Sequence, residues 1–144
     1  MLKTFNELSV QQLYQILKLR SAVFVLEQQC LYEDMDDKDQ QCHHLMLFEG
    51  DQLAAYSRLL PAALSFDEVS IGRVITNPAF RGKGLARKLM EQSIEACFHL
   101  FGRQPIRIGA QLYLKDFYQS LGFVQQGEMY LEDDIPHVEM LLEV

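Results

Sequence analysis

The stretch Val74-Ile-Thr-Asn-Pro-Ala-Phe-Arg-Gly-Lys-Gly-Leu-Ala-Arg-Lys-Leu-Met90 decides how this chain folds. A β-branched run over 69–76 stops at Asn77-Pro78, and an apolar-periodic stretch begins at Leu85, directly after a turn with two glycines. This order predicts a strand, a glycine-rich turn and the N-terminus of a helix. Such a turn points unpaired backbone N–H groups at one anion, with the positive end of the helix dipole behind them.

The composition of the turn favours a phosphate ligand. Gly82 and Gly84 allow the backbone to approach a phosphate closely, and cationic side chains surround them: Arg81, Lys83, Arg87 and Lys88. A basic turn that only caps a helix is the simpler interpretation. The preceding strand, the following helix and the four cations instead predict a ligand that carries a pyrophosphate.

The spacing of the glycines narrows the class of ligand. A dinucleotide site needs Gly-x-Gly-x-x-Gly, but Arg87 stands at the third glycine position, and the chain has no P-loop string. The remaining pattern, Arg81-x-x-Gly84-x-Ala86, resembles the Arg/Gln-x-x-Gly-x-Gly/Ala signature of the GCN5-related N-acetyltransferases (GNAT). The resemblance implies that the pyrophosphate of acetyl-coenzyme A binds to Arg81, Gly82, Lys83, Gly84, Leu85, Ala86 and Arg87.

The periodicities elsewhere predict strands at 2–8, 44–48, 52–60, 68–76, 106–111, 123–130 and 137–143, and helices at 10–25, 84–101 and 114–121. The order is the acetyltransferase order. We therefore expect an α/β (α+β) fold of the GNAT acyl-CoA N-acyltransferase type: a mixed central sheet, splayed between its two middle parallel strands and flanked by helices. A chain of 144 residues is long enough for one core, so we expect a single domain over 1–144.

A second motif, Phe117-Tyr118-x-x-x-Gly122-Phe123, resembles the family's element beside the cofactor thiol. The resemblance implies that Tyr118 donates a proton to the departing coenzyme A thiolate, a task that suits a phenol at neutral pH. A half-buried helix tyrosine is the plain alternative. The motif follows the glycine-rich turn at 81–84, which we call the pyrophosphate turn, and this order favours the catalytic role.

Two longer stretches, 20–44 and 130–137, resemble the ElaA group of bacterial acetyltransferases, and the first is also similar to acyl-homoserine-lactone synthases. The family implies direct transfer of an acetyl group to an amine. A backbone N–H near Val74 would stabilise the tetrahedral oxyanion. Val74 and Thr76 would flank the pantetheine arm. Tyr113 and Leu114 stand where the wider family often has an asparagine, and Gln111 could substitute for its hydrogen bond to that arm.

The sequence identifies the general base of the reaction less narrowly than the general acid. Glu27, His44, Glu68 and His137 are candidates because each borders the expected cleft, and we assign catalytic roles to Glu27 and His137 beside Tyr118 and Val74. Both histidines are equally compatible with structural hydrogen bonds. Cys42-His43-His44 cannot all point at one ion from a strand, so we predict no metal.

The net charge of −7 disfavours nucleic acid as a partner. In the acid-rich stretch 33–39 we expect most charges to be solvated in a loop, and the remainder to favour a cationic substrate. The cysteines at 30, 42 and 97 have no paired spacing, and no apolar run resembles a signal peptide or membrane span. We therefore expect a cytoplasmic protein without a membrane partner.

The sequence leaves two alternative functions open: a non-catalytic coenzyme A-binding module, and an acyltransferase related to acyl-homoserine-lactone synthases. It does not choose the acceptor amine. A homodimer through the C-terminal strands is also compatible with it.

Overall fold

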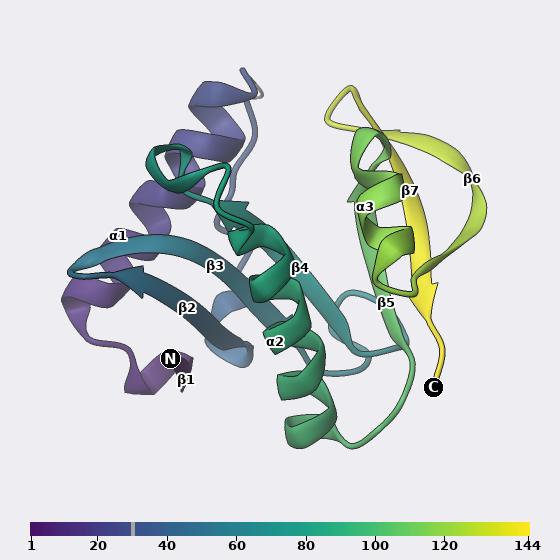
Figure 1. The fold of residues 1–144 in the computed structure, drawn as a ribbon, viewed down its shortest axis with the longest axis horizontal. Coiled ribbons are helices and arrows are strands. Elements are labelled where there is room, and N and C mark those ends of the chain that lie inside the picture. The colour runs from purple at the N-terminus through teal and green to yellow at the C-terminus, as the bar shows by residue number, and fades with distance from the viewer. Residues whose placement is uncertain (30) are drawn as a thin grey trace.

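The structure is a computed structural model that describes residues 1–29 and 31–144, and its elements follow the expected order (Figure 1). The strands are β1 (Leu2–Thr4), β2 (His43–Glu49), β3 (Gln52–Leu60), β4 (Ser70–Thr76), β5 (Ile106–Gln111), β6 (Val124–Glu132) and β7 (Ile135–Leu142). The α-helices are α1 (Val10–Arg20), α2 (Leu85–Phe101) and α3 (Lys115–Ser120). Shorter helical turns are η1 (Phe5–Glu7), η2 (Ser21–Glu27), η3 (Asp39–Gln41), η4 (Pro78–Phe80) and η5 (Leu112–Leu114).

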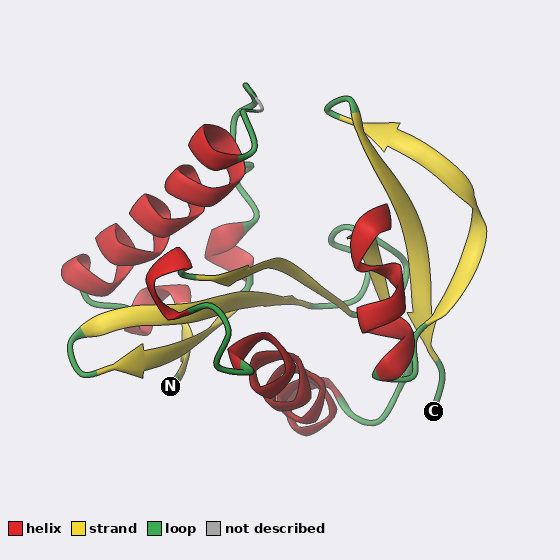
Figure 2. Ribbon diagram, turned by 45° about the horizontal axis from the view of Figure 1, so that its top comes forward, coloured by secondary structure: helices red, strands yellow, loops and turns green. Residues whose placement is uncertain are grey.

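The strands form two antiparallel sheets, β1-β2-β3-β4 and β5-β7-β6. Their junction is a parallel bridge between Val69 and Ile106, where the Arg107 N–H donates to the Val69 carbonyl at 2.9 Å. Beyond this bridge β4 and β5 diverge, as Figures 1 and 2 show. The expected mixed sheet with splayed middle strands is therefore confirmed.

Helices α1 and α2 cover opposite faces of the first sheet (Figure 2). On one face Ile16 and Leu19 of α1 pack against Met46 and Tyr56. On the other face Leu85 and Leu89 of α2 pack against the two middle strands. Their partners are Leu45 of β2 and Ala54 and Ala55 of β3. Each face of the sheet thus carries its own apolar layer.

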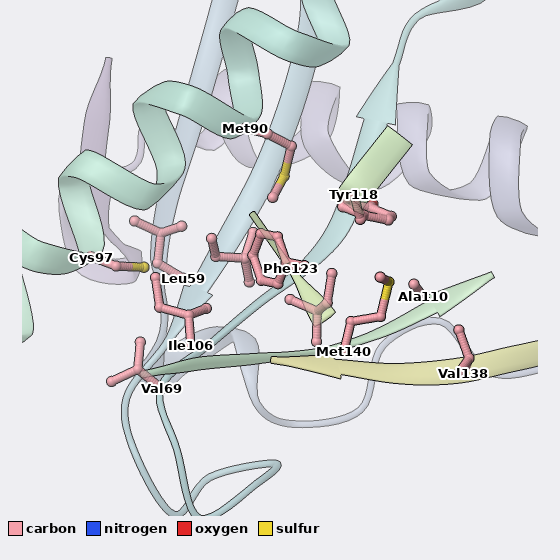
Figure 3. Close-up of a cluster of buried hydrophobic side chains, with 12 residues drawn as sticks. Leu59, Val69, Met90, Cys97, Ile106, Ala110, Tyr118, Phe123, Val138 and Met140 are labelled. Atoms are coloured by element: carbon pink, nitrogen blue, oxygen red, sulfur yellow. The ribbon is translucent and has the colours of Figure 1, made fainter. Parts of the chain in front are cut away.

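The largest core cluster lies where the two sheets meet (Figure 3). Val69 and Ile106 of the bridge pack there with Phe123 and Met140, and Cys97 of α2 is buried in the same cluster. This cluster fixes the angle at which the two sheets diverge because its side chains come from both of them.

Several boundaries differ from the sequence prediction, and three of these differences have a clear local description. β1 ends at Thr4 because the Thr4 side chain and N–H bind the Glu7 carboxylate and start a 3₁₀ turn. The first helix continues past residue 25 as the π-helical turn Ser21–Glu27. The last hairpin turns on Asp133-Asp134 alone, both with positive φ, so β7 begins earlier than predicted.

In the described part of the chain, no helix combines the length and apolar character needed to cross a membrane.

Candidate active site

A cavity of about 980 Å³ opens where β4 and β5 diverge. Most of the predicted site residues line it: Glu27, Val74, Thr76, Arg81, Gly82, Gly84, Leu85, Ala86, Gln111, Tyr118 and His137. Lys83 and Arg87 lie outside this lining. The divergence of the sheets therefore brings the pyrophosphate turn and the candidate acid and base to one space.

The pyrophosphate turn has the backbone that its glycines predict. Gly82 and Gly84 have φ values of 84° and 74°, in the left-handed region that favours glycine. Gly84 is the N-cap of α2, and it makes no side-chain cap hydrogen bond within the described part of the chain. Its free N–H groups and the helix dipole make the turn suitable for an anion.

Two cations of the turn have partners close by. Lys83 Nζ lies 5.3 Å from the centroid of the Phe80 ring. Arg87 lies over the Phe117 ring and donates to Ser120 Oγ at 2.6 Å. Arg87 therefore joins the start of α2 to α3, the helix that carries Tyr118.

Arg81 forms two hydrogen bonds with the Glu27 carboxylate, at 2.8 and 3.1 Å. Both side chains are nearly half exposed, at 46% and 43%. Glu27 thus lies at the end of η2 beside the pyrophosphate turn, where it neutralises the arginine predicted to bind phosphate.

β4 contains a bulge at the predicted oxyanion position. Tyr56 pairs with Ile75, but Arg58 pairs with Gly72, so Arg73 and Val74 together face one residue of β3. Arg73 has a φ of 50°, an uncommon conformation for a residue with a side chain. The bulge removes Val74 from the regular ladder at the edge of the cavity.

Tyr118 is 6% exposed and lines the cavity from α3. Its ring makes edge contacts with Phe117 and Phe123, with centroid distances of 5.2 and 6.0 Å, and Figure 3 shows it at the border of the core cluster. Burial, with a smaller effect of Tyr113, raises the pKa of the phenol. Tyr118 is therefore a protonated donor at neutral pH.

His137 lies on β7, directly opposite Gln111 of β5, and its ring stacks on Tyr130 at 5.9 Å. Nδ1 is 2.7 Å from the Ile135 carbonyl. Because a carbonyl oxygen accepts, Nδ1 carries the hydrogen, and the lone pair of the neutral ring is on Nε2. Nε2 lies 3.4 Å from the Glu132 carboxylate.

The other two candidate bases lie outside the cavity lining. His44 is 1% exposed and uses both ring nitrogens, with Nδ1 bonded to the Tyr56 hydroxyl and Nε2 to the Asp39 carbonyl. Glu68 forms a two-point ion pair with Arg107. Both residues therefore have structural partners.

A buried ionic network beside the cavity was missed by sequence reasoning. Asp34, Asp36 and Asp39 of the acid-rich stretch pair with three arginines at 2.6 to 3.0 Å: Arg20 of α1, Arg58 of β3 and Arg73 of the bulge. Arg20 has no exposed side-chain surface, and Asp39 is buried. The expectation that most charges in 33–39 are solvated is wrong for these three aspartates.

The sequence does carry a signal for this network. Arg20 follows Ile16 by four positions, on the buried stripe of its helix, and Arg58 interrupts an apolar strand. Buried arginines require carboxylate partners. The network pins residues 34–39 to β3 and β4, and thereby builds one wall of the cavity.

Among residues 1–29 and 31–144, no three His, Cys, Asp or Glu side chains converge as a metal site. Cys42 and Cys97 are buried free thiols. The remaining cysteine, at position 30, lies outside the described residues.

Comparison with known proteins matches residues 4–144 to the family described as "Acetyltransferase (GNAT) domain". Protein ElaA of Escherichia coli (strain K12) is 45% identical over 141 residues, which cover 96% of this chain and 92% of that protein. The crystal structure of E. coli ElaA aligns with a TM-score of 0.93 at 42% identity, covering 99% of this chain and 97% of the other. The crystal structure of an acyl-CoA N-acyltransferase from Pseudomonas aeruginosa aligns with a TM-score of 0.92 at 40% identity, covering 98% of this chain and 97% of the other.

A CoA-dependent acyl-homoserine lactone synthase is also similar, with a TM-score of 0.74 at 19% identity, covering 91% of this chain and 75% of that one. At that identity the similarity establishes the fold alone.

Proposed function

Because the chain belongs to the GNAT acetyltransferase family, we propose that it transfers the acetyl group of acetyl-coenzyme A directly to a primary amine. The family and its solved neighbours support acyl-CoA-dependent acyltransfer; the acetyl donor and the amine acceptor are the proposal. The observation that carries it is one cavity lined by the pyrophosphate turn, by Tyr118 and by His137.

The pyrophosphate would bind at the N-terminus of α2, where Gly82 and Gly84 adopt positive φ and the first turn has no side-chain cap. Arg81 would add positive charge to this site once the phosphate displaces the Glu27 carboxylate or shares the arginine with it. The pantetheine arm would lie between β4 and β5, flanked by Val74, Thr76 and Gln111.

The chemistry needs one base, one oxyanion donor and one acid. His137 Nε2 takes a proton from the ammonium of the acceptor, and the imidazolium formed lies 3.4 Å from Glu132. The amine nitrogen then attacks the thioester carbon, and the backbone N–H at Val74 stabilises the oxyanion. When the carbon–sulfur bond breaks, the Tyr118 hydroxyl gives its proton to the thiolate. The amine loses its second proton to solvent, and proton exchange through solvent then returns the His137 imidazolium and the Tyr118 phenolate to their starting forms.

Tyr118 is suited to this step because it is protonated, buried and held by aromatic contacts. Glu27 is a weaker base candidate than His137, since its carboxylate is bound to Arg81 at the pyrophosphate turn. We therefore assign the base to His137 and an electrostatic role at the cofactor to Glu27.

Two measurements test the proposal. Acetyl-coenzyme A at a hundred times its dissociation constant should stabilise the protein by about 2.7 kcal/mol, and this is visible as a higher melting temperature. Release of free coenzyme A thiol over pooled primary amines should then identify an acceptor pool.

The outcomes separate the alternatives. A melting shift without thiol release from any amine pool would favour a non-catalytic coenzyme A-binding module. Turnover that requires an acyl-carrier-protein donor would favour the relationship with acyl-homoserine-lactone synthases. Absence of any shift with acetyl-coenzyme A would contradict the cofactor site itself.

A further inference from the structure

One face of the β5-β7-β6 sheet carries polar residues and forms a wall of the cavity on its acceptor side. On β5 and β7, Ile108, Ala110, Val138 and Met140 are buried in the core cluster, and the residues between them point the other way because side chains alternate along a strand. The alternate residues include Gly109, Gln111, His137 and Glu139, all of which line the cavity.

This wall is acidic. Glu132 and Glu139 line it. Arg107 is shared between Glu139 and Glu68, so among the described residues one of those two negative charges has no cation of its own. Tyr130 also lines the cavity, and a Cβ on Gly109 would be 3.1 Å from the Tyr130 hydroxyl. The missing side chain of Gly109 lets the phenol lie directly on the backbone of β5.

The opposite wall is cationic. Lys38, Arg58 and Arg73 line it, together with the single carboxylate of Asp36; Asp34 and Asp39 pair with the arginines from behind, outside the lining. The three arginines and three aspartates of the network cancel in charge. Lys38 therefore leaves this wall with one net positive charge.

Lys38 Nζ is fixed in position by a 2.8 Å hydrogen bond to Ser65 Oγ, an uncharged partner. The Arg58 side chain is 4% exposed, and its Nε is a buried donor without a hydrogen-bond partner in the described part of the chain. Nε lies 3.8 Å from the position of a Cβ on Gly72, which borders the cavity. The unsatisfied donor adds to the positive potential of this wall.

We propose that the acceptor is a small primary amine that also carries a carboxylate, such as an amino acid. Its carboxylate lies toward Lys38 and Arg73, and its ammonium lies toward Glu132, Glu139 and His137. A singly charged anion matches the one uncompensated cation of Lys38 better than a phosphate does. The inference rests on the proposed function and names the substrate class of the same site.

The test compares acceptors that differ in one group. Glycine, β-alanine, γ-aminobutyrate and L-lysine are each assayed beside the corresponding carboxamide, with thiol release at saturating acetyl-coenzyme A. At least one carboxylate should exceed its carboxamide in kcat/KM by about tenfold or more, because a charge-assisted hydrogen bond is lost in the amide. Equal rates for every pair, or faster turnover of the carboxamides, would overturn the substrate class and leave the acetyltransferase function standing.

A lysine variant assigns the effect to the cationic wall. Lys38→Gln keeps a polar side chain at this position and should reduce the ratio between carboxylate and carboxamide toward one. Lys18→Gln makes the same charge change on an exposed position of α1, outside the cavity lining, and should keep the ratio. A ratio that survives Lys38→Gln would contradict the role of this wall.

A binding measurement separates the substrate class from catalysis. With coenzyme A bound, the preferred amino acid should raise the melting temperature further, and its carboxamide should not. Selective binding without turnover would support the substrate class and contradict the proposed function. If amines are acetylated but the amino acid and its carboxamide bind and react equally well, the proposed function is supported and the substrate class is contradicted.

Discussion

Arg81 and Glu27, 54 positions apart in the sequence, form a two-point ion pair beside the cavity. The pair joins the pyrophosphate turn to the π-helical end of the first helical segment. Its position means that the arginine of the family signature already holds a carboxylate before any phosphate arrives.

Glu27→Gln should therefore strengthen the binding of coenzyme A. The pair is exposed, and such pairs contribute about 0–1 kcal/mol, so we expect the dissociation constant to fall by no more than about fivefold. Calorimetric titration measures it, with Glu33→Gln as a charge-matched control at an exposed position outside the lining. A hundredfold loss of kcat in Glu27→Gln would instead return this residue to the role of the base.

Tyr118→Phe should lower kcat by about 10²-fold or more, the usual contribution of a general acid. The phenyl ring keeps the edge contacts with Phe117 and Phe123, so the melting temperature and the affinity for coenzyme A should change little. Tyr14→Phe, on an exposed face of α1, is the control. Unchanged kcat at saturating substrates would remove Tyr118 from the acid role.

His137→Gln should lower kcat/KM by about 10²-fold at neutral pH, since the acceptor then has no base. The deficit should shrink as the pH rises toward about 10, where an alkyl ammonium loses its own proton. His99→Gln, at an exposed position of α2, should match the unmodified protein across the same range. A deficit that stays constant with pH would indicate a positioning role.

Gly84→Asp should abolish binding of coenzyme A, because it places a carboxylate at the anion site. Gly50→Asp in the β2–β3 hairpin is a matched control: both glycines have positive φ, and an added Cβ meets no atom within 4 Å at either position. Both variants should lose about 1–2 kcal/mol of stability from the left-handed backbone. Retained affinity in Gly84→Asp would contradict the pyrophosphate assignment.

Asp39→Asn should destabilise the protein by about 3–5 kcal/mol, because it leaves the buried guanidinium groups of Arg20 and Arg58 short of a counter-charge. Asp37→Asn is the control in the same segment: the side chain is exposed, and asparagine tolerates the φ of 62°. Denaturant titration at pH 7 measures both. A loss below 1 kcal/mol in Asp39→Asn would show that the network contributes little to stability.

The same carboxylate predicts how stability depends on pH. Burial alone raises the pKa of Asp39, but Arg20 and then Arg58 lower it below its ordinary value. Its contribution is therefore present above the unfolded pKa, near 3.9, and is lost as the pH falls through the folded value. Asp39→Asn should flatten this part of the stability curve.

The local parts of the site could be predicted from the sequence because their signals are local. Gly82 and Gly84 lie directly before the helix whose start they form. The strand Gln52–Leu60 lies between the turn residues Gly50-Asp51 and Pro61, and along Ile106–Gln111 more buried and more exposed residues alternate. The ionic network could not be predicted in this way. Arg73 and Asp34 are 39 positions apart, and only the folded sheet brings the bulge of β4 against that loop.

The base assignment shows the same limit. Nothing near His44 distinguishes it from His137 in the sequence, since each is the first residue of a predicted strand. Their surroundings separate them: both are buried, but the two ring nitrogens of His44 are bonded to Tyr56 and Asp39, whereas His137 lines the cavity. The neighbours that decide this come from other elements, so pattern alone could not rank the two.

The Val69–Ile106 bridge has a mechanical consequence. The bridge and the core cluster around it hold the two sheets together at one end, so a small rotation of the β5-β7-β6 sheet about that end would widen the cavity most at the distant end. At that end the side chains of Gln28 and Gln111 touch by one 3.2 Å hydrogen bond. Widening the cavity for a bulkier acyl group would thus load this contact and the Arg87–Ser120 hydrogen bond between α2 and α3, and it would leave every strand ladder intact.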